Sequence, residues 1–172
     1  MKTLIAYLSL FLISCSTYKT VRNKELQVLN NQLEGKFQST PILIKSNHFK
    51  TNMENLFEIT NSDSLLRLKV NSNNELEIRY KNQLGGKEVQ TFKGKFKRKY
   101  FKIFLEKDRI TFPPFYWVTK VNRLKIGLDK KGQLVINQHF DHSAMIMLFA
   151  AGSSSNNQYV FKQSKNMCPF FC

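Results

Sequence analysis

The sequence contains few of the residues and spacings that catalysis and metal binding require. Its 172 residues include only three cysteines, three histidines and 12 acidic residues. The cysteines lack the ligand spacing of a structural zinc site, no Gly-x-Ser-x-Gly turn presents a nucleophile, and the carboxylates show no pairing that suits acid and base roles. We therefore expect no enzyme activity, no catalytic residue, no cofactor and no metal site.

One pair of histidines comes close to a metal-binding pattern. His139 and His142 are three residues apart, with Asp141 between them. They would hold a metal only if a turn brought their rings together, and histidines at the end of a strand are usually solvated. We expect the solvated state.

A long apolar run is also absent. Residues 4–13 are apolar except for Ser9, but this run is too short to cross about 30 Å of hydrocarbon, which requires about 20 residues. It does not predict a membrane-spanning helix. Because it follows the positive charge of Lys2, it predicts an export signal.

The residues that end this run are Leu12, Ile13, Ser14 and Cys15. They resemble the lipobox of bacterial lipoproteins, with an aliphatic residue three positions before the cysteine and a small residue just before it. The resemblance implies that residues 1–14 are a cleaved signal peptide and that Cys15 carries a diacylglyceryl thioether and an amide-linked chain such as palmitate. Each buried methylene adds about 0.8 kcal/mol, so three chains would hold the protein in a membrane. A plain secretory signal is the alternative.

The residues after Cys15 bear on location. Ser16 stands where an Asp would retain such lipoproteins in the inner membrane, and residues 17–20 contain no acidic residue. The resemblance therefore implies an outer-membrane anchor that faces the periplasm. Residues 15–23 are polar and are expected to form a lipidated tether.

Acidic residues are scarce relative to basic ones. The chain has 27 lysines and arginines against 12 acidic residues, a formal net charge of +15. Such a balance favours anionic partners, here a membrane lipid and not nucleic acid, which is poorly placed outside the cytoplasm. The candidates for an anionic surface are Lys93, Lys95, Lys97, Arg98, Lys99 and Lys102. The alternative is that these residues form an ordinary solvated face.

Apolar residues recur at two different periods. Leu26, Leu29 and Leu33 are spaced as on one face of a helix, which predicts a short helix of two or three turns ending near Gly35. From Gly35 onward the period is two, which is typical of antiparallel strands with one wet face. This alternation occurs in residues 65–70, 75–81, 91–99, 123–129 and 133–140.

Turn-forming residues separate these runs. They occur at 61–64, 71–74, 85–86, 107–108, 129–132 and 152–157. Eight or more short strands in chain order predict an all-β domain over residues 24–165, an antiparallel up-and-down β-barrel, with a β-sandwich as the alternative. Residues 166–172 are expected to form a tail.

The start of this domain supports a barrel. A short helix followed by Leu33, Gly35 and Phe37 resembles the opening of lipocalin-type barrels, although Phe37 stands where those proteins carry Trp. The resemblance implies that the last strand, near Tyr159 and Phe161, closes against the strand at Gly35. It also implies a lumen able to bind a small apolar or amphipathic ligand.

Two apolar segments remain to be placed. In TFPPFYWVTK, Pro113 and Pro114 predict a bend or barrel rim crowded by aromatic rings. These rings either line a ligand site or plug the end of the barrel; the pocket candidates are Phe92, Phe96, Phe112, Phe115, Tyr116 and Trp117. Residues 144–151, AMIMLFAA, are expected to form a buried strand, with a covering helix or a surface dipping towards a membrane as alternatives.

The remaining cysteines, Cys168 and Cys172, lie at the end of the chain. In an oxidising compartment an even pair favours a disulfide, although so small a loop would add little stability. Free thiols and a redox or metal role are the alternatives.

Two functions fit these features. The first is a membrane-anchored lipoprotein whose lipocalin-like barrel binds a small apolar or amphipathic ligand. The second is a non-catalytic structural or assembly lipoprotein that contacts an envelope protein or anionic lipid. The volume of the barrel lumen distinguishes them, because a filled lumen leaves no room for a ligand.

Overall fold

A computed structural model describes residues 21–30, 32–45, 51–60, 62, 64–112, 115–147 and 149–164. Eight strands follow one another in the chain, and each pairs with the next in antiparallel orientation. Their bounds are β1 (Glu34–Lys45), β2 (Leu65–Val70), β3 (Glu75–Lys81), β4 (Lys87–Lys97), β5 (Tyr100–Phe112), β6 (Tyr116–Leu128), β7 (Leu134–Ile146) and β8 (Phe149–Gln163). The predicted all-β, up-and-down class is confirmed.

The first and last strands pair, so the sheet closes into a ring. In this pairing Phe37 lies opposite Gln163 and Pro41 opposite Phe161. The register shifts between these pairs, because β1 has more residues here than the facing part of β8. The predicted closure of the last strand against the strand at Gly35 is therefore confirmed. It leaves the short strands β2 and β3 without an open edge in the ring.

The interior of the ring is filled by the apolar faces that the period of two predicts. Leu66, Leu68, Leu76 and Ile78 from β2 and β3 have no exposed surface. They pack in one cluster with residues of the longer strands: Phe101, Ile103, Leu124, Ile126, Leu134, Ile136, Tyr159 and Phe161. A short helix, α2 (Met53–Leu56), adds Met53 and Leu56 to this cluster.

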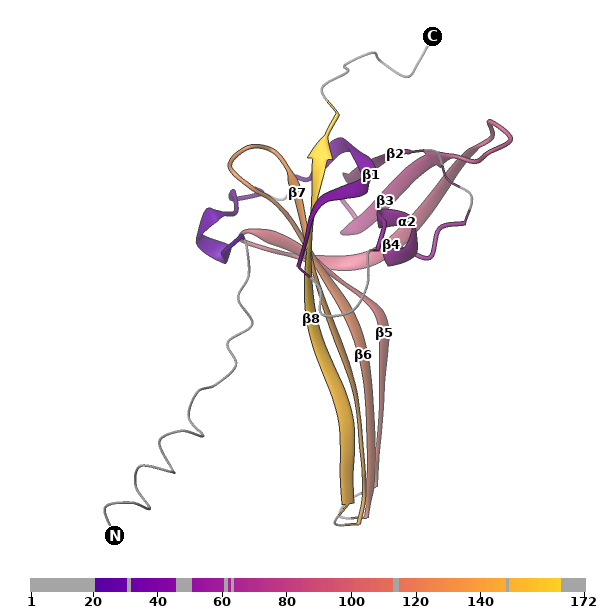
Figure 1. Ribbon diagram of the computed structural model, residues 1–172, viewed down its shortest axis with the longest axis vertical. Coiled ribbons are helices and arrows are strands. Elements are labelled where there is room, and N and C mark those ends of the chain that lie inside the picture. Colours follow the sequence, from indigo (N-terminus) through magenta and orange to yellow (C-terminus); the bar gives the residue numbers. More distant parts are fainter. Residues whose placement is uncertain are drawn as a thin grey trace.

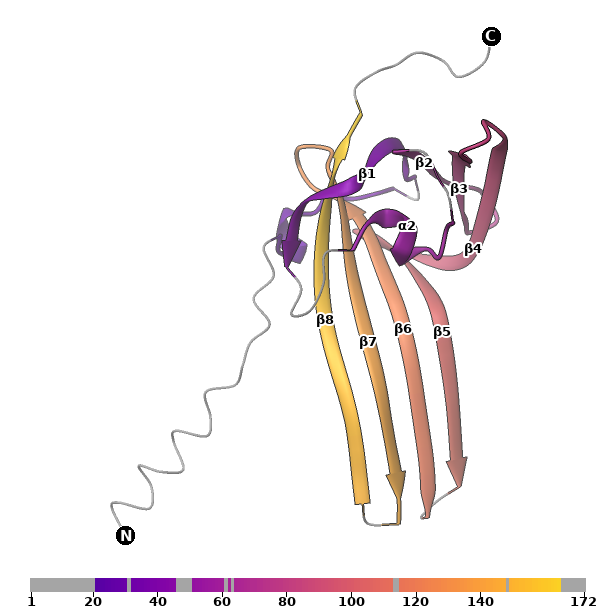
Figure 2. The ribbon, with the colours of Figure 1, turned by 45° about the vertical axis from the view of Figure 1, so that its right-hand side comes forward.

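The strands differ in length, and this difference shapes the molecule. β5 to β8 contain 13 to 15 residues, whereas β2 and β3 contain six and seven. β4 pairs only with the first four residues of β5, and β1 pairs only with the last six residues of β8. The other halves of the long strands leave the ring and project from it as a four-stranded sheet (Figures 1 and 2).

We call this projection the blade and define it as residues 104–112, 116–123, 139–146 and 149–157. Within the described residues, residues 104–112 have β6 as their only strand partner and residues 149–157 have only β7. Among the described residues, the blade is therefore a single layer with two open edges and two open faces. The strands form a ring that is not evenly arranged around one axis.

The leucines near the N-terminus do not form the expected helix. The structure has one 3-10 turn, η1 (Asn23–Glu25), followed by extended chain. Leu26, Leu29 and Leu33 are nevertheless buried. The backbone of this segment is held by other elements, because the Gln27 N–H donates to the Leu128 carbonyl (2.8 Å) and the Leu29 N–H donates to the Arg98 carbonyl (3.2 Å).

Two of the expected turns are also wrong. Residues 107–108 lie within β5, where Asp108 pairs with Lys120, and residues 152–157 lie within β8, where Ser153 pairs with His142. The turns at 71–74, 85–86 and 129–132 are where the sequence predicts them, and the turn expected at 61–64 lies partly outside the described residues. At residues 129–132, the Asp129 carboxylate accepts hydrogen bonds from the Lys131 and Gln133 N–H groups (2.8 Å each), and Gly132 has a positive φ of 76°.

Buried polar groups fix the start of the described chain to the barrel. The Val21 N–H donates to the Gln158 side-chain oxygen (2.7 Å), and the Gln158 amide donates to the Val21 carbonyl (2.9 Å) and to Asn137 (2.7 Å). Val21 therefore lies at the level of Gln158, where β8 leaves the ring and enters the blade. Within the described part of the chain, no helix has the length and apolar character needed to cross a membrane.

Candidate functional site

The free end of the blade brings together the two apolar segments that the sequence singles out. We call it the tip and define it as the described residues 110–112, 115–118, 144–147 and 149–151. The segment around Trp117 forms the β5–β6 hairpin end, and residues 144–147 and 149–151 belong to the β7–β8 hairpin end. The two turns are joined because the Met147 N–H donates to the Phe115 carbonyl (2.5 Å).

Strand register arranges the tip in apolar rows. On the face continuous with the barrel interior, one row runs Ile110, Val118, Ala144 and Ala151, and the next runs Phe112, Tyr116, Ile146 and Phe149. On the opposite face, Trp117 and Met145 lie between Thr111 and Ala150. The tip is therefore almost wholly apolar on both faces.

These side chains are exposed. Phe112 is 67% exposed, Phe149 83% and Met147 60%. In a β-sheet of a soluble domain at least one face is normally buried against another layer. An exposed apolar patch of this kind usually marks a contact with another molecule or a membrane.

A polar band lies directly behind the tip. Asp108, Lys120, His142 and Ser153 form one row on the inner face. Arg109, Thr119, Ser143 and Gly152 form the row on the outer face. The change from apolar to polar side chains therefore occurs at the same level on all four strands.

The structure separates the six predicted pocket residues. Phe112, Phe115, Tyr116 and Trp117 lie at the tip, while Phe92 and Phe96 pack against the barrel core. Phe92 contacts Phe57 (ring centroids 5.5 Å) and Phe96 contacts Phe101 (4.9 Å). The six aromatic rings do not line one pocket, and the aromatic segment lies beyond the barrel rim.

The expected buried strand over residues 144–151 is wrong. Residues 144 and 145 are half-buried, and Ile146, Met147 and Phe149 are exposed. The chain also turns at Met147. Continuous apolar sequence arises here because both faces and the turn belong to the tip, and not because two faces are buried.

His139 and His142 lie on opposite faces of β7, because three residues along a strand reverse the side. The His139 ring Nδ1 is 2.9 Å from the Asn156 side-chain oxygen. Within the described residues, no group of three potential metal ligands occurs.

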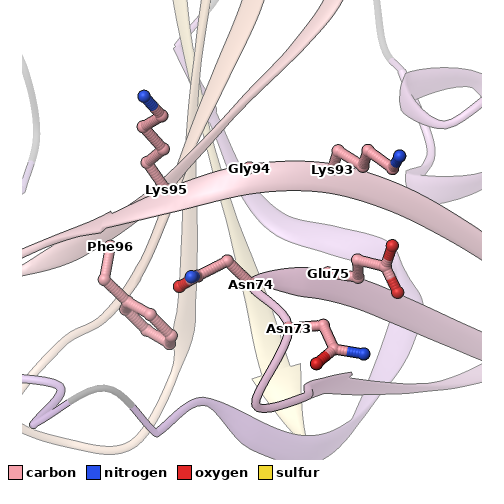
Figure 3. Close-up of a pocket in the computed structure, with 7 residues that line it drawn as sticks. All are labelled: Asn73, Asn74, Glu75, Lys93, Gly94, Lys95 and Phe96. Atoms are coloured by element: carbon pink, nitrogen blue, oxygen red, sulfur yellow. The ribbon is translucent and has the colours of Figure 1, made fainter.

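A shallow depression lies at the end of the barrel, far from the tip. It is lined by the β2–β3 turn (Asn73, Asn74 and Glu75) and by β4 from Lys93 to Phe96 (Figure 3). Lys95 and Phe96 project to opposite sides of β4, so only one of the two faces the barrel interior. This site is polar and open.

The predicted anionic-surface residues lie on the barrel. Lys93, Lys95 and Lys97 are exposed along β4, and Arg98 and Lys99 form the turn that follows, as predicted. Lys93 lies opposite Glu75. The Lys99 ammonium donates to the carbonyls of Asn23 and Lys24 (3.2 and 3.3 Å). Lys102 of β5 lies between Lys95 of β4 and Lys125 of β6 in one cross-strand row.

The lipidation and disulfide candidates lie outside the described residues. This applies to the expected signal peptide 1–14, to Cys15, and to Cys168 and Cys172 in the tail. Of the expected tether, only residues 21–23 are described. These remain predictions from the sequence.

Comparison of the chain with protein-family models, with curated proteins and with solved structures gives no match. The fold defines the class of protein as an all-β, antiparallel up-and-down barrel with a projecting sheet.

Proposed function

We propose that this protein is a lipid-anchored, non-catalytic envelope lipoprotein that places the tip of its blade in the bilayer holding its anchor. The observation that carries this proposal is the exposed apolar tip on a single-layer sheet. The bilayer is that of the outer membrane, on its periplasmic side, as the lipobox-like sequence implies.

A ligand in the barrel has less support. The described residues fill the ring with side chains that have no exposed surface, including Phe37, Phe101 and Phe161. Four of the six aromatic candidates form a convex tip and not a concave site, whereas small-molecule sites are concave. A bilayer can surround a convex apolar end from all sides.

The chemistry of the tip limits how far it can enter a bilayer. Its rows span about three residues per strand, or about 10 Å, which is less than half of a 30 Å hydrocarbon layer. The blade edges carry backbone groups without strand partners among the described residues. Each such group costs several kcal/mol in hydrocarbon, and the polar band behind the tip adds to this cost. The tip therefore suits one leaflet, near the headgroups.

The lengths of blade and tether agree with one shared membrane. Val21 lies at the level of Gln158, and Phe149 is nine residues further towards the tip, about 30 Å along β8. With about 10 Å of the tip inserted, Val21 would stand about 20 Å above the surface. The six residue-to-residue steps from Cys15 to Val21 reach at most about 20 Å. An upright blade and an acylated Cys15 thus fit the same leaflet.

The chain contains a single tryptophan, Trp117, and it lies at the tip. Its fluorescence reports directly on the environment of the tip. The test uses the full, acylated chain in vesicles of phosphatidylcholine and phosphatidylglycerol, with and without brominated lipids. We expect brominated lipid to quench Trp117 and acrylamide to quench it weakly.

A double variant and a matched control sharpen this test. Phe112→Ser with Phe149→Ser removes two exposed rings, each worth about 1.5–3 kcal/mol when fully buried, and should return Trp117 to water. Leu84→Ser removes the most exposed apolar side chain of the barrel, at 95% exposed, and should leave quenching unchanged. Quenching of Trp117 by acrylamide but not by brominated lipid would contradict the proposal and would favour a protein as the partner of the tip.

The anchor needs a separate test. Cys15→Ala should give an unprocessed precursor that takes up no fatty-acid analogue in cells. Labelling that persists in this variant would refute acylation at Cys15. Non-reducing peptide mapping of the wild-type protein should recover Cys168 and Cys172 in one crosslinked fragment.

A further inference from the structure

Cross-strand register gathers six cations on the outer face of β4, β5 and β6, where the barrel meets the blade. We call this group the outer cluster; its members are Lys95, Lys97, Lys102, Lys107, Arg123 and Lys125. Lys95 lies opposite Lys102, and Lys102 lies opposite Lys125. One row below, Phe104 lies opposite Arg123.

An irregularity in β5 adds Lys107 to this face. Between Phe104 and Glu106 the register shifts by one residue, so that Leu105 is an extra residue in the strand. Without this bulge, Lys107 would point to the face of the barrel interior. The ring of Phe104 then lies between two ammonium groups, 4.4 Å from that of Lys102 and 5.4 Å from that of Lys107.

This arrangement opposes the usual pairing of charges in a sheet, because like charges directly across strands destabilise it. Carboxylates are absent from the nearest cross-strand positions. The β7 residues beside Lys125 and Arg123 are Asn137 and His139, and Asp141 lies two strands away from Lys107. Burial lowers the pKa of Lys102 below its usual range, and the charges of Arg123, Lys97 and Lys107 lower it further.

Arg123 provides an independent observation. Its Nε is buried and has no hydrogen-bond partner in the structure. An unpaired buried donor is costly, and a guanidinium group is suited to bidentate binding of phosphate oxygens. The Nε itself is closed to solvent, so an anion with several oxygens would bind the outer nitrogens of this guanidinium group, and it would relieve the mutual repulsion of the lysines.

We propose that the outer cluster is a binding site for a phosphate-bearing anion, with Arg123 and Lys102 at its centre. The site does not depend on the tip and stands apart from it, because about ten residues of β5 separate Lys102 from Phe112. The phosphate can belong to a soluble phosphate ester or to a lipid headgroup.

Thermal unfolding of the full chain in neutral detergent micelles tests the site. Pyrophosphate should raise the unfolding midpoint to a plateau. This rise should be larger than the rise that sodium chloride causes at equal ionic strength. Short-chain phosphatidylglycerol is the second arm. Saturation by the lipid alone would assign the site to a headgroup, and saturation by pyrophosphate alone would assign it to a soluble ester.

Variants give the site a readout that a merely solvated face would not show. Arg123→Gln and Lys102→Gln should each weaken anion binding at least about tenfold. Lys102→Gln should also raise the midpoint without anion at low salt, because it removes repulsion. Lys93→Gln, an exposed lysine of β4 opposite Glu75, is the matched control and should change neither quantity.

Two results would overturn the proposal. One is that neither pyrophosphate nor short-chain phosphatidylglycerol changes the unfolding midpoint by more than sodium chloride does at equal ionic strength. The other is a saturating response that both variants retain. If Arg123→Gln does not fold, Lys102→Gln decides the outcome alone. The proposal predicts that this variant has a higher unfolding midpoint without anion and yet binds the anion more weakly.

Discussion

The barrel and the blade are built from the same strands but differ in what their side chains contact. In the ring, β8 presents Tyr159 and Phe161 to a filled interior, and both are buried. In the blade, the same strand presents Phe149 and Ala151 on that face, and both are exposed. Alternation along a strand thus determines which residues share a face, but neighbouring layers determine whether that face is buried. A function that needs exposed apolar groups can therefore be built by extending strands past the core.

The largest contrast should appear in hydrogen exchange. The Ser164 N–H donates to Lys36 in β1, so even-numbered residues of β8 direct their backbone groups away from β7. For Val160 this side faces β1, whereas Ser154 has no strand there among the described residues. We expect the Ser154 amide to exchange at least about a thousandfold faster than the Val160 amide. Equal protection measured by mass spectrometry would mean that the β8 edge is covered.

Core substitutions should sharpen the contrast between the two regions. Phe37 is fully buried in the barrel and Phe112 is 67% exposed at the tip. Phe37→Ala should lower the free energy of unfolding by about 3–5 kcal/mol, because it leaves a cavity. Phe112→Ala should change it by no more than about 0.5 kcal/mol. Urea unfolding followed by far-UV circular dichroism measures both, and a large loss in Phe112→Ala would show that the tip is packed.

Sequence patterns predict the barrel better than the blade, and particular residues show why. Leu66, Leu68, Leu76 and Ile78 alternate with polar residues, so they predict strands with one buried face. The run 152–157 is made of Gly, Ser and Asn, which are typical turn residues, yet it is strand. Both of its faces are open, so no apolar alternation marks it.

The tip could not be predicted for a related reason. Its two segments are 26 or more positions apart along the chain (144 minus 118), and only the pairing of β6 with β7 brings Trp117 beside Met145. The available signal was the length of the run after Gly132, which contains neither glycine nor proline as far as Ile146. A strand longer than β2 and β3 must extend beyond the ring that these short strands complete.

A smaller effect is expected at the turn that starts β7. The Asp129 carboxylate is buried and accepts two backbone N–H groups, as described above. Asp129→Ala leaves these donors unpaired and should cost about 1–3 kcal/mol. Asp129→Asn retains an oxygen acceptor and is the control. Urea midpoints of the two variants should therefore differ, and equal midpoints would show that water satisfies the turn.

The smallest effect is expected at the surface of the barrel. The Arg67 guanidinium donates to the Glu34 carboxylate (2.6 Å), and this bond is the main cause that lowers the pKa of Glu34. Its stabilising effect is present above the ordinary carboxyl pKa and is lost as the pH falls through the lower pKa of the folded state. Because the pair is largely exposed, it should contribute at most about 1 kcal/mol. Arg67→Gln should remove this part of the acid sensitivity in urea titrations, and unchanged sensitivity would refute it.

The pairing of β1 with β8 also sets an order of folding. Leu43 pairs with Val160, 117 positions later (160 minus 43), whereas the hairpins β5–β6 and β7–β8 form from neighbouring segments. Local hairpins form within microseconds, while contacts between distant segments form slowly. A chain that emerges N-terminus first cannot close its ring until its last strand arrives. The blade and its tip are therefore complete while the barrel is still open.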